Sequence, residues 1–575
     1  MQTPGDLDRA LEAAEEAMEL DSANAAALYN RALALERIGL ADAADDAWRT
    51  YLRVDDDSGW ADEARGWLRH TVVADVAPPA APTPASAAEF ARRAPQQANA
   101  WGWETLLPAW AAARDSGHAA AADSALRLAE SVGAALVTVR RDATLADAVA
   151  AIRAADPAGA ARLARAHSLY GKARGLYESG DRPAAEPLFA RAAADGAGSP
   201  TLQMWARLFH GAALAYSADP AAMSEIEAVV AGADSARHPA LAGRARWILG
   251  NTLALQNRHE EARNSFVRSA RLLDRADEDE HLAFVQFLTA NSLHRMGSEA
   301  AADQEGHRAM LRLRAYPLSG WRHVVLISAA TRAHESGLLL TALQYHAEDV
   351  RVTEQAGKPI HIVEARAARA RLLTALGQTE AGLRDVMTTR PLMPKLRAEA
   401  QEWARHDLLE VRASHRLRHD PAGAAILLDS VVDFHARRPP RLLSALLTRA
   451  QARLASSNEP GARADLHAAA DVILDRATAI RTAHLRSALF EQARHVFDQM
   501  VMASVTAGDH RQALEQMESA RTVFARLPRD QSARIRSRVG EAAIQYAVIG
   551  DTLLTWVVTA DTVRLVRQTA DRRRL

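Results

Sequence analysis

The chain has 575 residues, a formal net charge of -1, and 49% hydrophobic residues of which few are aromatic. A near-neutral balance gives no overall attraction to nucleic acid or to an anionic membrane. The lack of cysteine excludes disulfides, thiol nucleophiles and cysteine-based zinc sites. Alanine supplies much of the apolar total, which favours many short, closely packed helices over one large core.

The N-terminal stretch MQTPGDLDRALEAAEEA lacks the basic region and apolar core of a signal peptide. No apolar run of about 18 residues follows it, as a membrane-spanning helix would require. We therefore expect a cytoplasmic protein that binds neither membrane nor nucleic acid. The pattern from Asp8 to Leu20 predicts the second helix of a pair without its first, which indicates either a cap or a chain that continues upstream.

Two early segments resemble the tetratricopeptide (TPR) consensus, in which small residues mark the helix crossing and an aromatic residue closes the pair. The segment Leu28 to Leu52 has this spacing at Ala32, Gly39, Ala44 and Trp48. The segment Leu169 to Ala192 repeats it at Ala173, Gly180, Ala185 and Phe189. A third match, VTAGDHRQALEQMESARTVF, has it at Gly508, Ala513 and Met517. Arg31 and Lys172 depart from the consensus, which prefers leucine there.

A proline-rich segment interrupts the helical pattern early in the chain. Four prolines lie between Pro78 and Pro84, too many for a helix and enough for an extended, semi-rigid connection. We expect it to separate a small N-terminal TPR unit from the main array.

A regular repeat with a period of about 40 residues dominates the rest of the chain. One series consists of small residues in register: Ala222, Ala262, Ala302, Ala342, Gly382, Ala422 and Ala462. A second series, five residues earlier, consists mostly of turn or helix-stop residues: Ser217, Asn257, Gly297, Gly337, Gly377, Leu417 and Ser457. Each unit therefore predicts a helix, a short turn and a second helix whose first turn carries the crossing residue. Such pairs bury their apolar stripes by stacking on their neighbours.

The last predicted element is a β-hairpin within GDTLLTWVVTADTVRLV, Gly550 to Val566. Apolar and polar residues alternate on both sides of a possible turn at Thr559 to Thr562, which is typical of paired strands. A lone hairpin is marginal in water, so this one needs a further packing partner.

Together these elements predict an all-α fold: a TPR-like α-solenoid of helix pairs, with 34- and 40-residue repeats and a short C-terminal β-hairpin. The predicted domains are an N-terminal TPR unit, a Pro/Ala-rich linker, a TPR-like superhelical array and a hairpin region, at residues 1–70, 71–94, 95–527 and 540–575.

Motifs for catalysis or metal binding are incomplete. His259-Glu260 and His334-Glu335 each lack the second histidine four residues after the first that a zinc-binding helix requires. The Gly-Lys pair at Gly171 lacks the remainder of a phosphate-binding loop. We therefore predict a non-enzyme with no cofactor and no metal site.

Binding is better supported, because first helices of successive TPR units line one concave face. The residues projected onto that face are Tyr170, Arg174, Asn251, Phe284, Asn291, His294 and Arg371. Asn251 and Asn291 lie one repeat apart, so their amides are expected one above the other, where they could hold the backbone of an extended peptide. The alternatives are a neighbouring domain in the groove, or a solvated face with no partner.

Four parts of the chain carry a family resemblance: YNRALALERIGL with AWRTYLRVDDDSGWADEARGWL, PQQANAWGWETLLPAWAAARDSG, ALFEQARHVFDQMVMASVTAGDHRQALEQMESAR and IQYAVIGDTLLTWVVTADTVRLV. They resemble bacterial CHAT proteins, in which a TPR array precedes a caspase-fold protease domain. Glu518 and Arg521 resemble the Glu-x-x-Arg of that family's last array helix.

The resemblance implies that the hairpin opens a CHAT domain whose catalytic histidine and cysteine would follow beyond Leu575. The chain would then be the regulatory region of a caspase-like protease, with a CHAT domain as partner in cis or in trans. The alternative is a stand-alone TPR adaptor or regulator whose hairpin closes the array. The first reading expects Leu554, Trp556 and Val558 to be exposed, and the second expects them to be buried against the last helix.

Overall fold

The structure, a computed structural model, describes residues 4–68, 77–233, 237–316, 319–436, 439–479, 483–525, 542–559 and 562–569. The chain forms two compact units, which are described separately. The first comprises Met1–Leu68, His294–Ala300 and Arg322–Leu575, and the second comprises Arg69–Leu293 and Ala301–Trp321. The predicted domain boundaries remain a prediction. The side chain of Arg521 lies outside the described residues.

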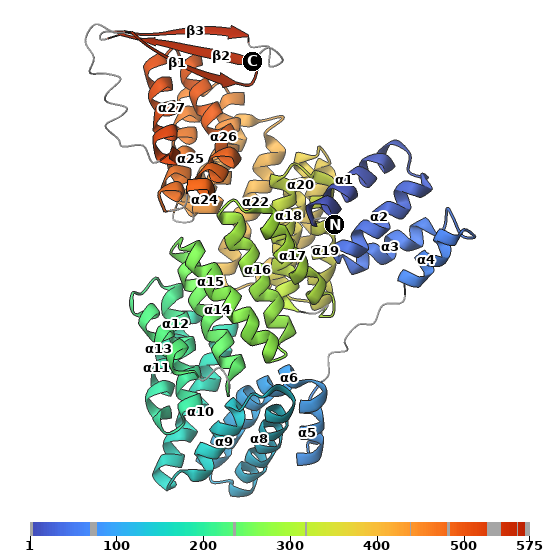
Figure 1. The fold of residues 1–575 in the computed structure, drawn as a ribbon, viewed down its shortest axis with the longest axis vertical. Helices are drawn as coiled ribbons and strands as arrows, with labels where there is room; N and C mark the ends of the chain where they lie inside the picture. Colours follow the sequence, from blue (N-terminus) through green and yellow to red (C-terminus); the bar gives the residue numbers. More distant parts are fainter. Residues whose placement is uncertain are drawn as a thin grey trace. The chain divides into compact units, whose positions relative to one another are not determined.

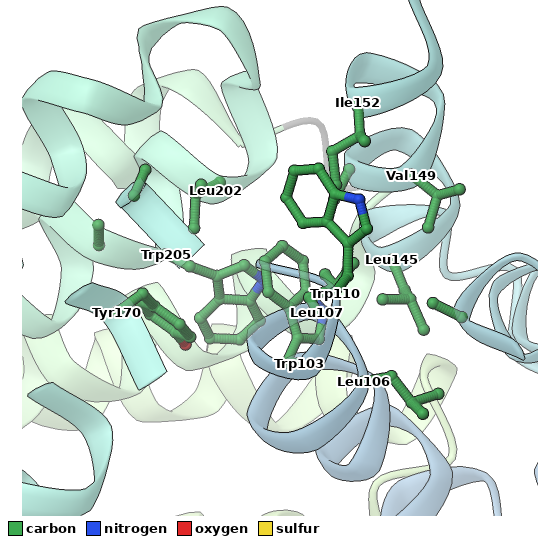
Figure 2. Close-up of a cluster of buried hydrophobic side chains, with 14 of the residues drawn as sticks. Trp103, Leu106, Leu107, Trp110, Leu145, Val149, Ile152, Tyr170, Leu202 and Trp205 are labelled. Carbon is green, nitrogen blue, oxygen red and sulfur yellow. The ribbon is translucent and has the colours of Figure 1, made fainter. Parts of the chain in front are cut away.

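The second unit begins with a run of helices (Figure 1). Their buried side chains form an aromatic core. The helices are α5 (Pro84–Arg93), α6 (Pro95–Trp101), α7 (Leu107–Asp115), α8 (Ala119–Arg140), α9 (Thr144–Ala154), α10 (Pro157–Glu178), α11 (Arg182–Asp195) and α12 (Pro200–Tyr216). Figure 2 shows Trp103, Trp110, Tyr170 and Trp205 converging on this core. A π-helical turn, Gly102–Leu106, carries Trp103 into it. The unit continues with α13 (Ala221–Gly232), α14 (Pro239–Leu255), α15 (His259–Arg275), most of α16 (Asp279–Arg295) and most of α17 (Glu299–Leu313).

The first unit contains the N-terminal and the later helices. The N-terminal ones are α1 (Pro4–Leu20), α2 (Ala25–Ile38), α3 (Ala41–Tyr51) and α4 (Gly59–Trp67). The later ones are α18 (Gly320–Glu335), α19 (Leu339–Ala356), α20 (Pro359–Ala375), α21 (Thr379–Thr389), α22 (Ala398–Arg416), α23 (Pro421–His435), α24 (Pro439–Ala455), α25 (Glu459–Ala479), α26 (Ala483–Thr506) and α27 (His510–Ala525). Helix pairs such as α20 with α21 and α24 with α25 pack together, so the predicted TPR-like helix pairing is confirmed.

The predicted turn positions explain why the helices end where they do. Five of the seven lie in the left-handed region with positive φ: Asn257, Gly297, Gly337, Gly377 and Ser457. This conformation ends a helix and redirects the chain into its partner. In the first repeat the left-handed residue is Ala218, one position after the predicted Ser217.

The crossing residues follow the same register with one exception. Ala262, Ala302, Ala342 and Ala462 are fully buried, whereas Ala422 is exposed. In that repeat Ala424 is buried instead, two residues later. The reason is local, because α22 ends at Arg416 and α23 begins only at Pro421, after a turn without a left-handed residue.

The C-terminal strands form an antiparallel three-stranded sheet in the order β1-β2-β3. Its strands are β1 (Ala543–Ile549), β2 (Thr552–Val558) and β3 (Val563–Thr569). The predicted hairpin is confirmed as β2 and β3, paired for example at Trp556 with Leu565. Strand β1 was not predicted. It pairs with β2, which is therefore the central strand of the sheet.

One face of this sheet is buried against α26 and α27. Leu554 and Trp556 are fully buried there, and Val558 nearly so, together with Val501 and Met517. The indole Nε1 of Trp556 also donates a hydrogen bond of 3.0 Å to the carbonyl oxygen of His510, at the start of α27. The sheet therefore packs on the last helix pair. This is the burial of Leu554, Trp556 and Val558 that the stand-alone alternative expects.

Within the first unit, the N-terminal helices and α19 cap one another. The carboxylate of Glu12 accepts hydrogen bonds from the backbone amides of Leu340 (3.1 Å) and Thr341 (2.7 Å), in the first turn of α19. In return, the fully buried carboxylate of Glu348 accepts a hydrogen bond of 3.2 Å from the backbone amide of Ala43, in the first turn of α3. Neither helix has a side-chain cap of its own, so each carboxylate satisfies otherwise unpaired donors.

Candidate functional site

Four ring side chains of the second unit form a cluster that we call the Trp247 patch: Trp247, His281, Phe284 and Trp321. The rings of Phe284 and Trp321 are stacked, with centroids 3.8 Å apart. Trp247 meets Phe284 edge-on at 5.3 Å and Trp321 at 5.9 Å. Both tryptophans are half-buried, while Phe284 is buried. The patch thus presents rigid aromatic surface to solvent.

The patch arises from three first helices of successive repeats. Trp247 lies on α14, Phe284 on α16 and Trp321 at the start of α18, at equal intervals that are each three residues shorter than the repeat. Each ring therefore lies nearly one helical turn earlier in its helix than the ring before it. The three rings, from different turns of their helices, therefore meet in one compact cluster.

A buried carboxylate lies beneath the patch. Glu278 is fully buried, and its side chain contacts the guanidinium of Arg244 at 3.0 Å and Nδ1 of His281 at 3.1 Å. Burial by itself would raise the pKa of Glu278, but Arg244, His281 and Arg140 outweigh it and hold that pKa well below its usual range. This ion cluster fixes the ring of His281 at the edge of Trp247.

Polar side chains border the patch as well. Glu280, one residue before His281, accepts hydrogen bonds from the amide of Gln96 at 2.8 Å and from the hydroxyl of Ser319. Half-buried tryptophans beside fixed carboxylates and an amide can make both apolar and hydrogen-bonding contacts, which is typical of protein interfaces. This arrangement favours binding rather than bond-breaking chemistry.

Two of the predicted binding residues lie in or beside the aromatic core. Tyr170 is buried and faces Trp103 and Phe189 (Figure 2 shows its place). Arg174, one turn further along α10, binds Glu104 at 2.8 Å and lies 4.2 Å from the ring centre of Phe209. Both side chains thus have packing or ionic roles, and their assignment to a binding face remains a prediction.

Three other predicted residues lie on helices that carry the patch. Phe284 is its centre. Asn251 is exposed on α14, four residues after Trp247 and so on the same side of the helix. Asn291 is half-buried on α16, seven residues after Phe284. The structure therefore relates Phe284 and Asn251 to one surface, and the peptide-binding role of all three remains a prediction.

The remaining two predicted residues belong to the first unit and carry ion pairs. His294 contacts Glu299 at 2.9 Å and Glu335 at 3.0 Å. Burial alone would lower its pKa, but hydrogen bonds with both carboxylates raise that pKa to about 9. Arg371 lies 3.6 Å from Asp407, with Glu410 a little further away. Their role in binding also remains a prediction.

Sequence reasoning missed both tryptophans of the patch and His281. The 40-residue period relates residues at the same position of successive repeats. It does not relate residues that lie about one helical turn earlier in each repeat, as these rings do. The signal that could have found them is the equal spacing of Trp247, Phe284 and Trp321, in a chain with only 5% aromatic residues.

Comparison with known proteins finds distant structural neighbours and no family. No family model matches the chain, and no curated protein matches it significantly. A solved Rap protein in complex with competence and sporulation factor aligns with a TM-score of 0.41 and 12% identity, over 62% of this chain and 99% of that one. Yeast Tom70 aligns with a TM-score of 0.29 and 13% identity, over 93% of this chain and 87% of its own. Both scores are low, so the fold assignment rests on the helix pairing described above.

Across the described residues, every helix is too short or too polar to cross a lipid bilayer.

Proposed function

We propose that the chain is a non-catalytic protein-interaction scaffold that binds an extended peptide or a protein segment at the Trp247 patch. The half-buried rings of Trp247 and Trp321, which contact each other and the buried Phe284, carry this proposal. Tryptophan is enriched among interface residues that contribute most to affinity, because it offers a large apolar face with little conformational entropy to lose.

The surroundings of the patch support an extended ligand. The three large rings of the patch come from different helices at the second unit's surface, and Asn251 lies one turn beyond Trp247 on α14. The carboxylate of Glu280 adds an acceptor at the border of the patch. A peptide crossing successive helices could place apolar side chains on the rings and donate hydrogen bonds to these polar groups.

The proposal can be tested by selecting random peptides displayed on phage against the full chain and measuring the affinity of the selected peptides by calorimetry. We expect Trp321→Ala to weaken binding at least about 10-fold, the effect of a contact worth about 1.4 kcal/mol. Trp60→Ala is the matched control, because Trp60 is an exposed tryptophan of the other unit. Peptides that bind both variants and the unaltered chain equally would rule out the patch as the site.

A finer proposal is that this scaffold regulates a CHAT caspase-like protease domain, in cis or in trans. It rests on the resemblance of the sequence and on the outer face of the sheet, where Ile544, Tyr546 and Val566 are 66%, 67% and 46% exposed. An exposed apolar sheet face can receive further β structure.

The alternative, a stand-alone adaptor, is favoured by the opposite face of the same sheet. Leu554, Trp556 and Val558 are buried against α26 and α27, as a closing cap requires. The intact mass of the protein isolated from its source separates the two readings. A larger product containing cysteine and histidine beyond Leu575 would support the protease region, and a product ending there would leave the adaptor.

A further inference from the structure

A cluster of metal-ligand side chains lies in the first unit, away from the Trp247 patch. His323 comes from α18, while His361 and Glu364 come from α20. One potential ligand atom from each of the three lies within 4.8 Å of the other two. We call these residues the His323 cluster. His361 and Glu364 are three positions apart on α20, which places both side chains on the same side of that helix.

The distances suit a small divalent cation. The Nε2 atom of His323 is 3.1 Å from the carboxylate of Glu364, and the two imidazole rings have centroids 4.6 Å apart. Metal–ligand bonds of about 2.0–2.1 Å in a tetrahedral site place ligand atoms about 3.4 Å from one another. Small side-chain movements therefore suffice to bring all three ligand atoms onto one ion.

The second ring nitrogen of His323 is already fixed. Its Nδ1 lies 2.8 Å from Oδ1 of Asp349, a fully buried carboxylate on α19. An Nδ1–H that donates to a carboxylate leaves Nε2 as the ligating atom and increases its basicity, the usual outer-shell arrangement of metal-bound histidines. A buried carboxylate dedicated to orienting His323 distinguishes this cluster from exposed acidic groups.

The cluster is also accessible. His323 is buried, but His361 is half-buried and the side chain of Glu364 is 40% exposed. A cation can therefore enter from the side of α20, and a water molecule can complete the coordination. Two imidazoles, one carboxylate and a water form a common four-coordinate ligand set for zinc.

We propose that His323, His361 and Glu364 bind one Zn²⁺ ion, with Asp349 as the positioning residue of His323. The ion takes the place of the direct contact between Nε2 of His323 and the carboxylate of Glu364. It links α18 to α20, the first helices of two successive repeats, and so stiffens this part of the scaffold. Sequence analysis predicted no metal site, because the ligands are not in a single-helix motif and His323 and His361 lie in different repeats.

The test uses the full chain without a histidine tag, freed of metal by chelation and titrated with zinc in competition with a chromogenic chelator. We expect the unaltered chain to bind one more equivalent of zinc than the variants His361→Ala and Glu364→Gln, or to bind it at least about 10-fold more tightly. Asp349→Asn should keep the stoichiometry and lose about 10- to 100-fold in affinity. His334→Ala, which removes an exposed histidine of α18, is the matched control and should change nothing.

Two further measurements test the site. Cobalt substituted for zinc should give the visible absorption of a four-coordinate ion. Zinc should raise the melting temperature of the unaltered chain but not that of Glu364→Gln. Equal zinc binding by the unaltered chain and both ligand variants would overturn the proposal. His323 would then be an imidazolium bridging Asp349 and Glu364.

Discussion

Two stretches of the molecule with the same helix-pair architecture are stabilised by different interactions. Helices α5 to α12 surround a core of large rings, with Phe189 stacked on Phe209 and both beside Tyr170. Helices α18 to α25 instead join their pairs through charged groups, such as Arg369 with Asp385 at 2.7 Å. The shared architecture depends on small crossing residues and left-handed turns, so the remaining positions can be apolar or ionic.

The ionic contacts follow the repeat. Arg369 and Arg449 occupy equivalent positions two repeats apart, and so do their partners Asp385 and Asp465. In both pairs an arginine of the first helix reaches a buried aspartate of the second helix. Buried ion pairs contribute little net stability but make each partner costly to remove. The two stretches should therefore respond differently to truncation, to pH and to charge removal.

The largest effect is expected in the aromatic stretch. Phe189 is fully buried among three other rings, so Phe189→Ala removes its contacts and leaves a cavity. We expect a loss of about 3–5 kcal/mol in the free energy of unfolding. Hydrogen exchange of α10 to α12 in increasing urea measures it. Ile426→Ala, at an exposed position of α23, is the control and should change stability by less than about 0.5 kcal/mol.

In the ionic stretch, removing one charge should matter more than removing a pair. Arg449→Met leaves the buried Asp465 with Arg453, at 2.9 Å, as its one cationic partner among the described residues. The change should cost about 2 kcal/mol. Combining it with Asp465→Leu removes the stranded charge as well and should recover much of that loss. Hydrogen exchange of α24 and α25 reports both. If the double variant proved less stable than the single one, the pair itself would be a net stabiliser.

The stretches should also differ in their response to pH. His167 is buried beside Trp103 and Trp110, and neither ring nitrogen has a partner among the described residues. Burial lowers the pKa of His167 to about 3, below its unfolded value of about 6.5. Its contribution to stability is thus present above pH 6.5 and is lost as the pH falls toward 3, by about 1.4 kcal/mol per pH unit. Unfolding of α10 followed between pH 7 and 5 should show this slope, and His167→Leu should abolish it.

In the other unit, His294 should give the free energy of unfolding the opposite dependence on pH. Its pKa is raised to about 9 by Glu299 and Glu335, despite its burial. Its contribution is present below the unfolded pKa of about 6.5 and is lost as the pH rises through 9. His294→Gln should flatten the alkaline side of the stability profile and leave the acid side unchanged. A loss on the acid side would contradict the assigned ion pairs.

A smaller effect is expected for the reciprocal caps. Glu12→Gln weakens the acceptor at the first turn of α19 and should cost about 1 kcal/mol. Because the contact joins α1 to α19, the loss should appear as faster hydrogen exchange in α1 and α2. Glu16→Gln, on the same helix, is the matched control. Equal exchange in both variants would mean that the caps do not hold the N-terminal helices in place.

The sequence predicted the helix pairs because the residues that define them are local. A left-handed glycine or asparagine ends one helix, and an alanine five residues later fits the crossing, so period and residue type suffice. The sheet was predicted only in part. Strand β1 contains the exposed Ile544 and Tyr546, and its pairing with β2 depends on the contact with α26 and α27, which no local pattern encodes.

The candidate sites were harder to predict because they combine residues from several repeats. Phe284 was predicted from its face of the helix. Trp247 and Trp321 occupy other positions in their repeats, and only the packing of successive helices brings them to Phe284. Tyr170 fits the face pattern equally well and is buried instead, because α12 supplies Phe209 to cover it. Helical periodicity predicts which face of its helix a residue lies on. It does not predict which neighbouring helix buries that residue.

The smallest effect on stability is expected for two separate variants, Asn291→Ala in the second unit and Arg371→Ala in the first. Asn291 is half-buried on α16, and Asp407 keeps Arg441 at 2.5 Å when Arg371 is removed, so the fold should tolerate each change. Replacing a residue that contacts the peptide should lower affinity for a selected peptide at least about 10-fold with little change in melting temperature. Trp321→Ala is the comparison. Loss in both Asn291→Ala and Trp321→Ala would add Asn291 to the site of the second unit, and loss in Arg371→Ala would give that residue a binding role in the first unit. Loss in Trp321→Ala alone would confine binding to the Trp247 patch and remove Asn291 and Arg371 from it.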